Sequence, residues 1–141
     1  MAMILETLDI EILQEENAMD WEKAYPRLRK LRGRKLSSIS GRADIKLLDI
    51  TSDYYVVETS SGPKRRRTDE LRKVVKAMSL NKPVHVESDV KRGGGSSRNH
   101  PETVVAALPD VEYLFVEKKK HIVWIGKDSH RLGTLKERSS K

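Results

Sequence analysis

The chain of 141 residues contains no cysteine. This absence excludes a disulfide framework, a cysteine-ligated zinc site and a thiol nucleophile. The four histidines, His85, His100, His121 and His130, form no HExxH motif and no close cluster with carboxylates. We therefore predict no metal centre and no other cofactor.

Long apolar runs are missing too. No stretch approaches the ~20 apolar residues that a membrane span needs, and the N-terminal residues lack the basic start of a secretory signal. We therefore expect a soluble, intracellular protein, cytoplasmic or associated with the nucleoid or nucleus, that makes no membrane contact.

Aromatic side chains are scarce, at 5% of residues, which disfavours single-strand binders that stack successive bases on aromatic rings. Positive charge is abundant instead. The chain has 28 Lys and Arg against 21 Asp and Glu, a net charge of +7. Such an excess favours a polyanionic partner, most commonly nucleic acid.

The charges are segregated along the chain. Residues 1–22 contain seven acids and no Lys or Arg, whereas residues 23–42 contain eight bases and no acid. The acidic stretch can bind the basic one or another basic surface, so residues 1–31 are a candidate site for a protein partner. The alternative is that the two stretches are solvated helix faces of opposite sign.

Periodicity divides the chain into four parts. Residues 1–33 are predicted to form a helical arm, and 34–67 a small antiparallel sheet of three short strands with a fourth through Lys64–Arg67. Residues 68–126 are predicted to begin with a helix capped by Thr68. The segment 127–141 is rich in Lys, Arg and Ser, and we expect a disordered basic tail.

The order of elements in 68–126 is helix, short extended piece, short helix, loop, third helix and hairpin. This order, with the phrase Ser97-Arg98-Asn99-His100-Pro101 before the third helix and Leu108-Pro109 at its end, resembles a winged helix-turn-helix domain. The loop from Gly93 to Asn99 is longer than the usual turn of that family. The expected fold is thus α+β, with an N-terminal helical arm, a small antiparallel sheet and a C-terminal winged helix.

The resemblance implies that the third helix enters the major groove of DNA and that the hairpin wing reaches the backbone. Arginine suits a bidentate contact with guanine, and asparagine suits one with adenine. The predicted base-reading residues are Arg98, Asn99, His100 and Thr103. The predicted phosphate contacts are Lys91, Arg92, Lys118, Lys119, Lys120, Arg65, Arg66 and Arg67.

These patterns predict a non-enzymatic protein that binds double-stranded DNA, as a regulator or targeting subunit. The main alternative is a protein-protein adaptor that uses the winged helix and the acidic arm, and a second copy of the chain is a further candidate partner. An enzyme is disfavoured, because Ser96 and Ser97 near His100 lack an orienting acid and no phosphate-binding loop motif is present. The run Lys64–Arg67 has its own alternative, a solvated edge strand whose charges discourage edge-to-edge pairing.

Overall fold

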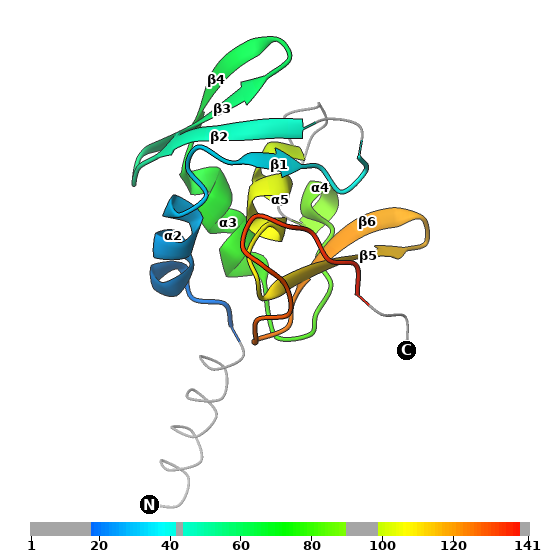
Figure 1. The fold of residues 1–141 in the computed structure, drawn as a ribbon. Coiled ribbons are helices and arrows are strands. Elements are labelled where there is room, and N and C mark those ends of the chain that lie inside the picture. The colour runs from blue at the N-terminus through cyan, green and yellow to red at the C-terminus, as the bar shows by residue number, and fades with distance from the viewer. Residues whose placement is uncertain (1–17, 42–43, 90–98, 139–141) are drawn as a thin grey trace, which may run out of the picture.

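Two antiparallel sheets with short helices between them make up the described part of the chain (Figure 1). The computed structural model describes residues 18–41, 44–89 and 99–138. The helices are α2 (Trp21–Arg29), α3 (Asp69–Ala77), α4 (Val86–Asp89) and α5 (Asn99–Ala106), and the strands are β1 (Lys35–Ser37), β2 (Asp44–Ile50), β3 (Tyr54–Thr59), β4 (Gly62–Arg67), β5 (Val111–Val116) and β6 (Lys119–Trp124). None of the helices in these ranges has the length and apolar character required to cross a membrane.

The larger sheet joins β1, β2, β3 and β4 in chain order. Alternate residues of its central strands, among them Leu47, Tyr55 and Val57, are buried, while Lys46 and Glu58 lie on the opposite, exposed face. This alternation is what a sheet with one face against the core and one face in water requires. All four predicted strands are present.

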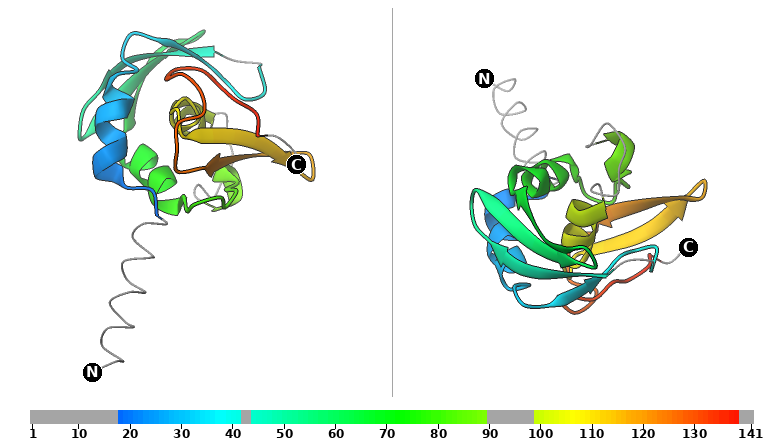
Figure 2. Two further views of the ribbon diagram at one scale, coloured as in Figure 1. Left: turned by 60° about the horizontal axis from the view of Figure 1, so that its bottom comes forward. Right: turned by 90° about the horizontal axis from the view of Figure 1, so that it is seen from above.

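Helix α3 begins where the sequence predicts, and its residues Leu71, Val74 and Val75 are buried. Thr68 does not cap it through its side chain. Its hydroxyl donates instead to the Thr51 carbonyl, at 2.7 Å, and so joins the start of α3 to the turn between β2 and β3. Figure 2 shows α3 and α5 under the inner face of the larger sheet, with α2 along its side.

The second sheet is the hairpin of β5 and β6, which pairs Val111 with Trp124 and Val116 with Lys119. Val84 exchanges backbone hydrogen bonds with Ile122 on one side of the hairpin. On the other side, the Tyr113 amide donates to the Lys136 carbonyl at 3.0 Å. The hairpin is therefore anchored on both sides at its base.

The expectation of a disordered tail is wrong for residues 127–138. Leu132 and Leu135 pack against the core, and the Gly133 amide donates to the Ala107 carbonyl at 2.8 Å. His130 Nε2 donates to the Val111 carbonyl at 2.6 Å. These contacts order a segment whose sequence is poor in apolar residues.

The predicted winged helix is wrong. The described residues are mainly sheet, and the helices are not arranged as in a winged-helix domain. All residues from Pro101 to Asp110 are buried, so α5 lies inside the molecule rather than at its surface. The order of elements was predicted well, but order alone does not fix how helices pack.

Candidate nucleic-acid interface

Of the residues predicted to read bases, the two with described side chains are half-buried or buried. Arg98 lies outside the described residues, and Asn99 begins α5 without a described side chain. His100 is half-buried, and Thr103 is only 3% exposed. Because a recognition helix must enter a groove as an exposed rod, α5 cannot serve as one.

The predicted wing keeps part of its positive charge. Lys118 and Lys119 are exposed at the hairpin turn. Lys120, in contrast, pairs with Glu102 of α5, with 3.0 Å between Nζ and Oε1. That ion pair accounts for a glutamate that is only 3% exposed, because a buried carboxylate needs a charged or hydrogen-bonded partner. Lys91 and Arg92 lie outside the described residues.

The arginine run of β4 divides by strand periodicity. Arg66 lies opposite Tyr55, whose ring is buried in the core. Its Nε donates to Glu70 Oε1 at 2.7 Å and to the Tyr55 hydroxyl at 3.2 Å, and the Tyr55 hydroxyl donates to Glu70 Oε1 at 3.0 Å. The structure therefore assigns Arg66 to the attachment of α3, not to a ligand.

Burial and the nearby carboxylate of Glu70 raise the pKa of Tyr55 well above its ordinary value. Burial alone would lower the pKa of Arg66, but its hydrogen bonds to Glu70 and Tyr55 and the attraction of Glu70 raise it. Both groups therefore stay protonated at neutral pH. The three side chains form a fixed polar clamp between the sheet and α3.

Arg65 and Arg67 project from the other face of β4 and are exposed. The Arg65 guanidinium carbon lies 3.8 Å from the centre of the Tyr54 ring, a close cation–π contact. Stacking on an aromatic ring orients the planar guanidinium and leaves its N–H donors free at the edge. Neither arginine forms an ion pair with any residue that the structure describes.

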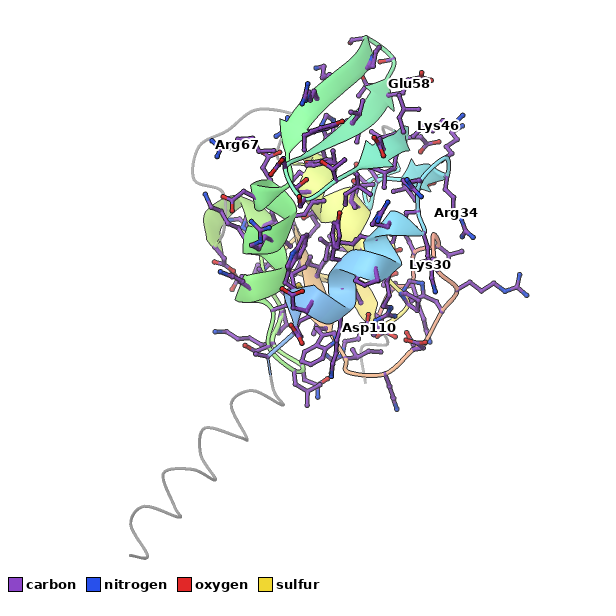
Figure 3. The ribbon with its side chains drawn as sticks, turned by 90° about the vertical axis from the view of Figure 1, so that its left-hand side faces the viewer. Lys30, Arg34, Lys46, Glu58, Arg67 and Asp110 are labelled. Carbon is purple, nitrogen blue, oxygen red and sulfur yellow. The ribbon has the colours of Figure 1, made fainter. Side chains whose placement is uncertain are left out.

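Other exposed cations lie on or near the larger sheet. In Figure 3, Lys30, Arg34 and Lys46 lie along one margin of the view, from the end of α2 up to the sheet, and Arg67 lies at the opposite margin, at the end of β4. We call Lys30, Arg34, Lys46, Arg65 and Arg67 the basic face. Two nearby acids have partners, since Lys35 pairs with Asp44 and Arg32 with Asp49. Two other acids interrupt the basic face: Glu58, opposite Lys46 in the ladder, and Asp53, in the same cavity as Arg65 and Arg67.

Sequence reasoning missed Lys30, Arg34 and Lys46 as single residues, although it noted the basic stretch 23–42. The alternation of β2 was the signal that places Lys46 on the solvent face. Lys30 and Arg34 follow the end of α2, and only the packing of this segment beside the sheet brings them near β2, where the Leu47 amide donates to the Arg34 carbonyl at 3.1 Å.

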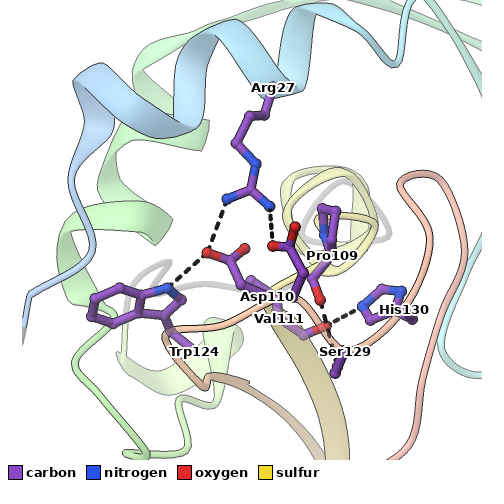
Figure 4. A network of polar contacts seen from close by, with 8 residues as sticks. Arg27, Pro109, Asp110, Val111, Trp124, Ser129 and His130 are labelled. Atoms are coloured by element: carbon purple, nitrogen blue, oxygen red, sulfur yellow. Dashed lines mark hydrogen bonds and ion pairs between the residues drawn. The ribbon is translucent and has the colours of Figure 1, made fainter.

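Two cavities lie near charged groups. One of about 530 Å³ is lined by Asp53, Tyr54, Arg65, Arg66, Arg67 and Glu70, beside the basic face. A larger one, of about 890 Å³, lies between α2 and the base of the hairpin. Figure 4 shows the polar network at that base, in which Arg27 Nη1 and Trp124 Nε1 both donate to Asp110 Oδ2 at 2.9 Å.

Within the described ranges, no three His, Asp or Glu side chains are grouped as metal ligands. Comparisons with known proteins give no relatives: no protein-family model, curated protein or solved structure matches the chain. A functional assignment must therefore depend on the surface itself.

Proposed function

We propose that the protein binds nucleic acid without enzymatic activity and holds the phosphate backbone of a duplex against the basic face. The observation that carries this proposal is the grouping of Arg65, Arg67 and Lys46 on one exposed sheet face. Cations of α2 and the following loop extend the same surface. Phosphate contacts of this kind supply affinity and orientation, not sequence recognition.

A duplex fits this surface better than a long single strand does. Binding of single strands generally requires successive aromatic rings on which bases stack. The aromatic ring of the basic face, Tyr54, lies under Arg65. The face therefore offers mainly guanidinium and ammonium groups, whose partners are phosphate oxygens.

The test is a titration of the full chain with a fluorescent random-sequence DNA duplex at 50 and 200 mM KCl. If about four phosphates are neutralised, the affinity falls by about a hundredfold over this range, from a salt slope near −0.9 per contact. The triple variant Lys46→Gln, Arg65→Gln, Arg67→Gln should bind far more weakly and with a smaller salt slope.

The matched control is the hairpin variant Lys118→Gln, Lys119→Gln. Figures 1 and 2 show the hairpin extending away from β3 and β4, so these lysines lie on a different part of the surface. We expect this variant to bind nearly as well as the wild type. Equal losses in both variants would contradict the assignment to the basic face, and undetectable binding at low salt would overturn the proposal.

The adaptor hypothesis has its own supporting observation. Phe115 and Val116, near the tip of the hairpin, are 51% and 38% exposed. Exposed apolar side chains on a projecting element are typical of protein contacts. This second candidate would be supported if the chain does not bind nucleic acid and Phe115→Ser abolishes binding of a protein partner.

A further inference from the structure

The cavity beside β3 and β4 has the components of a nucleotide site. The Arg65 guanidinium carbon lies 3.8 Å from the centre of the Tyr54 ring, and Arg65 is exposed to solvent. Unpaired bases stack on such guanidinium planes in protein complexes with nucleic acids. The stacked pair thus provides a flat platform at the wall of the 530 Å³ cavity.

Asp53 supplies an acceptor at the edge of this cavity. Its backbone is fixed, since its carbonyl accepts from the Thr68 amide at 3.1 Å and its amide donates to Thr51 Oγ1 at 3.2 Å. Its exposed carboxylate has no hydrogen bond or ion pair with a described residue. A carboxylate presents two adjacent acceptors, and among the bases guanine alone presents two adjacent donors, N1–H and N2–H, on its Watson–Crick edge.

Arg67 supplies the phosphate contact. It lies opposite Tyr54 in the β3–β4 ladder, and it lines the same cavity. The other guanidinium at the wall, that of Arg66, is held by Glu70 and Tyr55 and is not available to a ligand. The cavity therefore combines a stacking plane, a carboxylate and one unengaged guanidinium.

We propose that this cavity binds one unpaired guanine nucleotide of the nucleic acid that the basic face holds. The base stacks on Arg65, its Watson–Crick edge donates to Asp53, and its phosphate contacts Arg67. The base must be unpaired, because pairing with cytosine would occupy the edge that Asp53 contacts. This proposal rests on the proposed function and specifies the preferred ligand of the protein, a duplex with an extrahelical guanine.

The experiment compares three fluorescent DNA duplexes of one sequence: fully paired, with one extrahelical guanine, and with one extrahelical adenine. We expect the full chain to bind the guanine-bulged duplex about tenfold more tightly than the adenine-bulged one, as for other bidentate base contacts. In Asp53→Asn the two bulged duplexes should bind alike. Arg65→Lys keeps the positive charge but removes the planar guanidinium. In this variant the affinities for both bulged duplexes should approach the affinity for the paired duplex.

The matched control is Glu58→Gln, which removes one acid from the same sheet face outside the cavity. It should strengthen binding of all three duplexes alike. If the paired duplex binds through the basic face and guanine is not preferred, the guanine site is wrong and the proposed function stands. If Asp53→Asn keeps the guanine preference, the assignment of Asp53 is wrong. If no duplex binds, both proposals are overturned.

Discussion

At the scale of single residues, Asp110 joins three parts of the chain. One of its oxygens accepts from Arg27 of α2 and from Trp124 of β6, and its side chain is 11% exposed. Removing the carboxylate leaves Arg27 Nη1 and the indole N–H of Trp124 without their acceptor. Asp110→Ala is therefore expected to lower the free energy of unfolding by about 2–3 kcal/mol.

Urea unfolding followed by tryptophan fluorescence measures this loss, and Asp128→Ala is the matched control. Asp128 pairs with the same arginine at 3.0 Å, but its side chain is 74% exposed. Solvent-exposed ion pairs contribute at most about 1 kcal/mol. Similar losses in the two variants would show that burial of Asp110 does not govern the energy of this network.

Tyr55 makes the stability depend on alkaline pH. Burial and the Glu70 carboxylate raise its pKa above the ordinary value of 10.0, so the folded protein keeps a proton that an unfolded tyrosine releases. Above about pH 10 the unfolded chain binds fewer protons, and stability falls by up to about 1.4 kcal/mol per pH unit. The Tyr55→Phe variant has no phenol at this position, so it should not show this loss of stability.

Urea midpoints at pH 8, 9, 10 and 11 measure how the stability of the wild type and of Tyr55→Phe depends on pH. At pH 8 the variant should be less stable by about 1 kcal/mol, because it lacks the hydrogen bond to Glu70. The difference should shrink above pH 10, where only the wild type loses the contribution of Tyr55. Parallel curves across this range would contradict the raised pKa of Tyr55.

At the scale of elements, the turn of the β5–β6 hairpin is under backbone strain. Glu117 and Lys118 form its two-residue loop with φ of 52° and 68°, values that favour Asn and Gly. The double variant Glu117→Asn, Lys118→Gly keeps the net charge and should raise the free energy of unfolding by about 1 kcal/mol. Urea unfolding measures this gain.

The same hairpin variant also tests where nucleic acid binds. Because the basic face lies elsewhere, affinity for a duplex should not change. A weaker affinity together with higher stability would indicate that Lys118 contacts the ligand directly.

Elements with a clear local pattern could be predicted from the sequence. Apolar and polar residues alternate in β2 and β3, and apolar residues form a stripe along α3. Each pattern predicts which face of the element is buried, and the structure confirms these predictions. The position of α5 could not be predicted in this way. The apolar residues Val104, Val105 and Leu108 indicate one buried face, whereas burial of Glu102 depends on Lys120 from a hairpin that follows later in the chain.

The candidate site shows the same division. The run of Arg65, Arg66 and Arg67 was visible in the sequence, and period-two alternation separates the middle arginine from its neighbours. That Arg66 turns inward is explained by Glu70 on α3, and the role of Tyr54 depends on the conformation of Arg65. Tertiary contacts, which carry no local sequence signal, therefore decided which cations remain available.

At the scale of the whole molecule, the described residues share one hydrophobic core. The buried cluster runs from Met19 through both sheets to Ile122, and residues from the C-terminal segment pack against it. A shared core unfolds cooperatively, because exposing one part of it removes packing contacts of the other parts. The described residues should therefore unfold in a single transition.

The two tryptophans test this, because they lie in distant parts of the chain. Trp21 in α2 contacts Tyr25 and Arg72, and Trp124 ends β6. In Trp21→Phe the fluorescence reports on the hairpin, and in Trp124→Phe it reports on α2. Within each variant, the urea midpoint by fluorescence should equal the midpoint by far-ultraviolet circular dichroism, even though Trp124→Phe is less stable for lack of its bond to Asp110. Separate midpoints within either variant would show that α2 or the hairpin unfolds independently of the rest of the core.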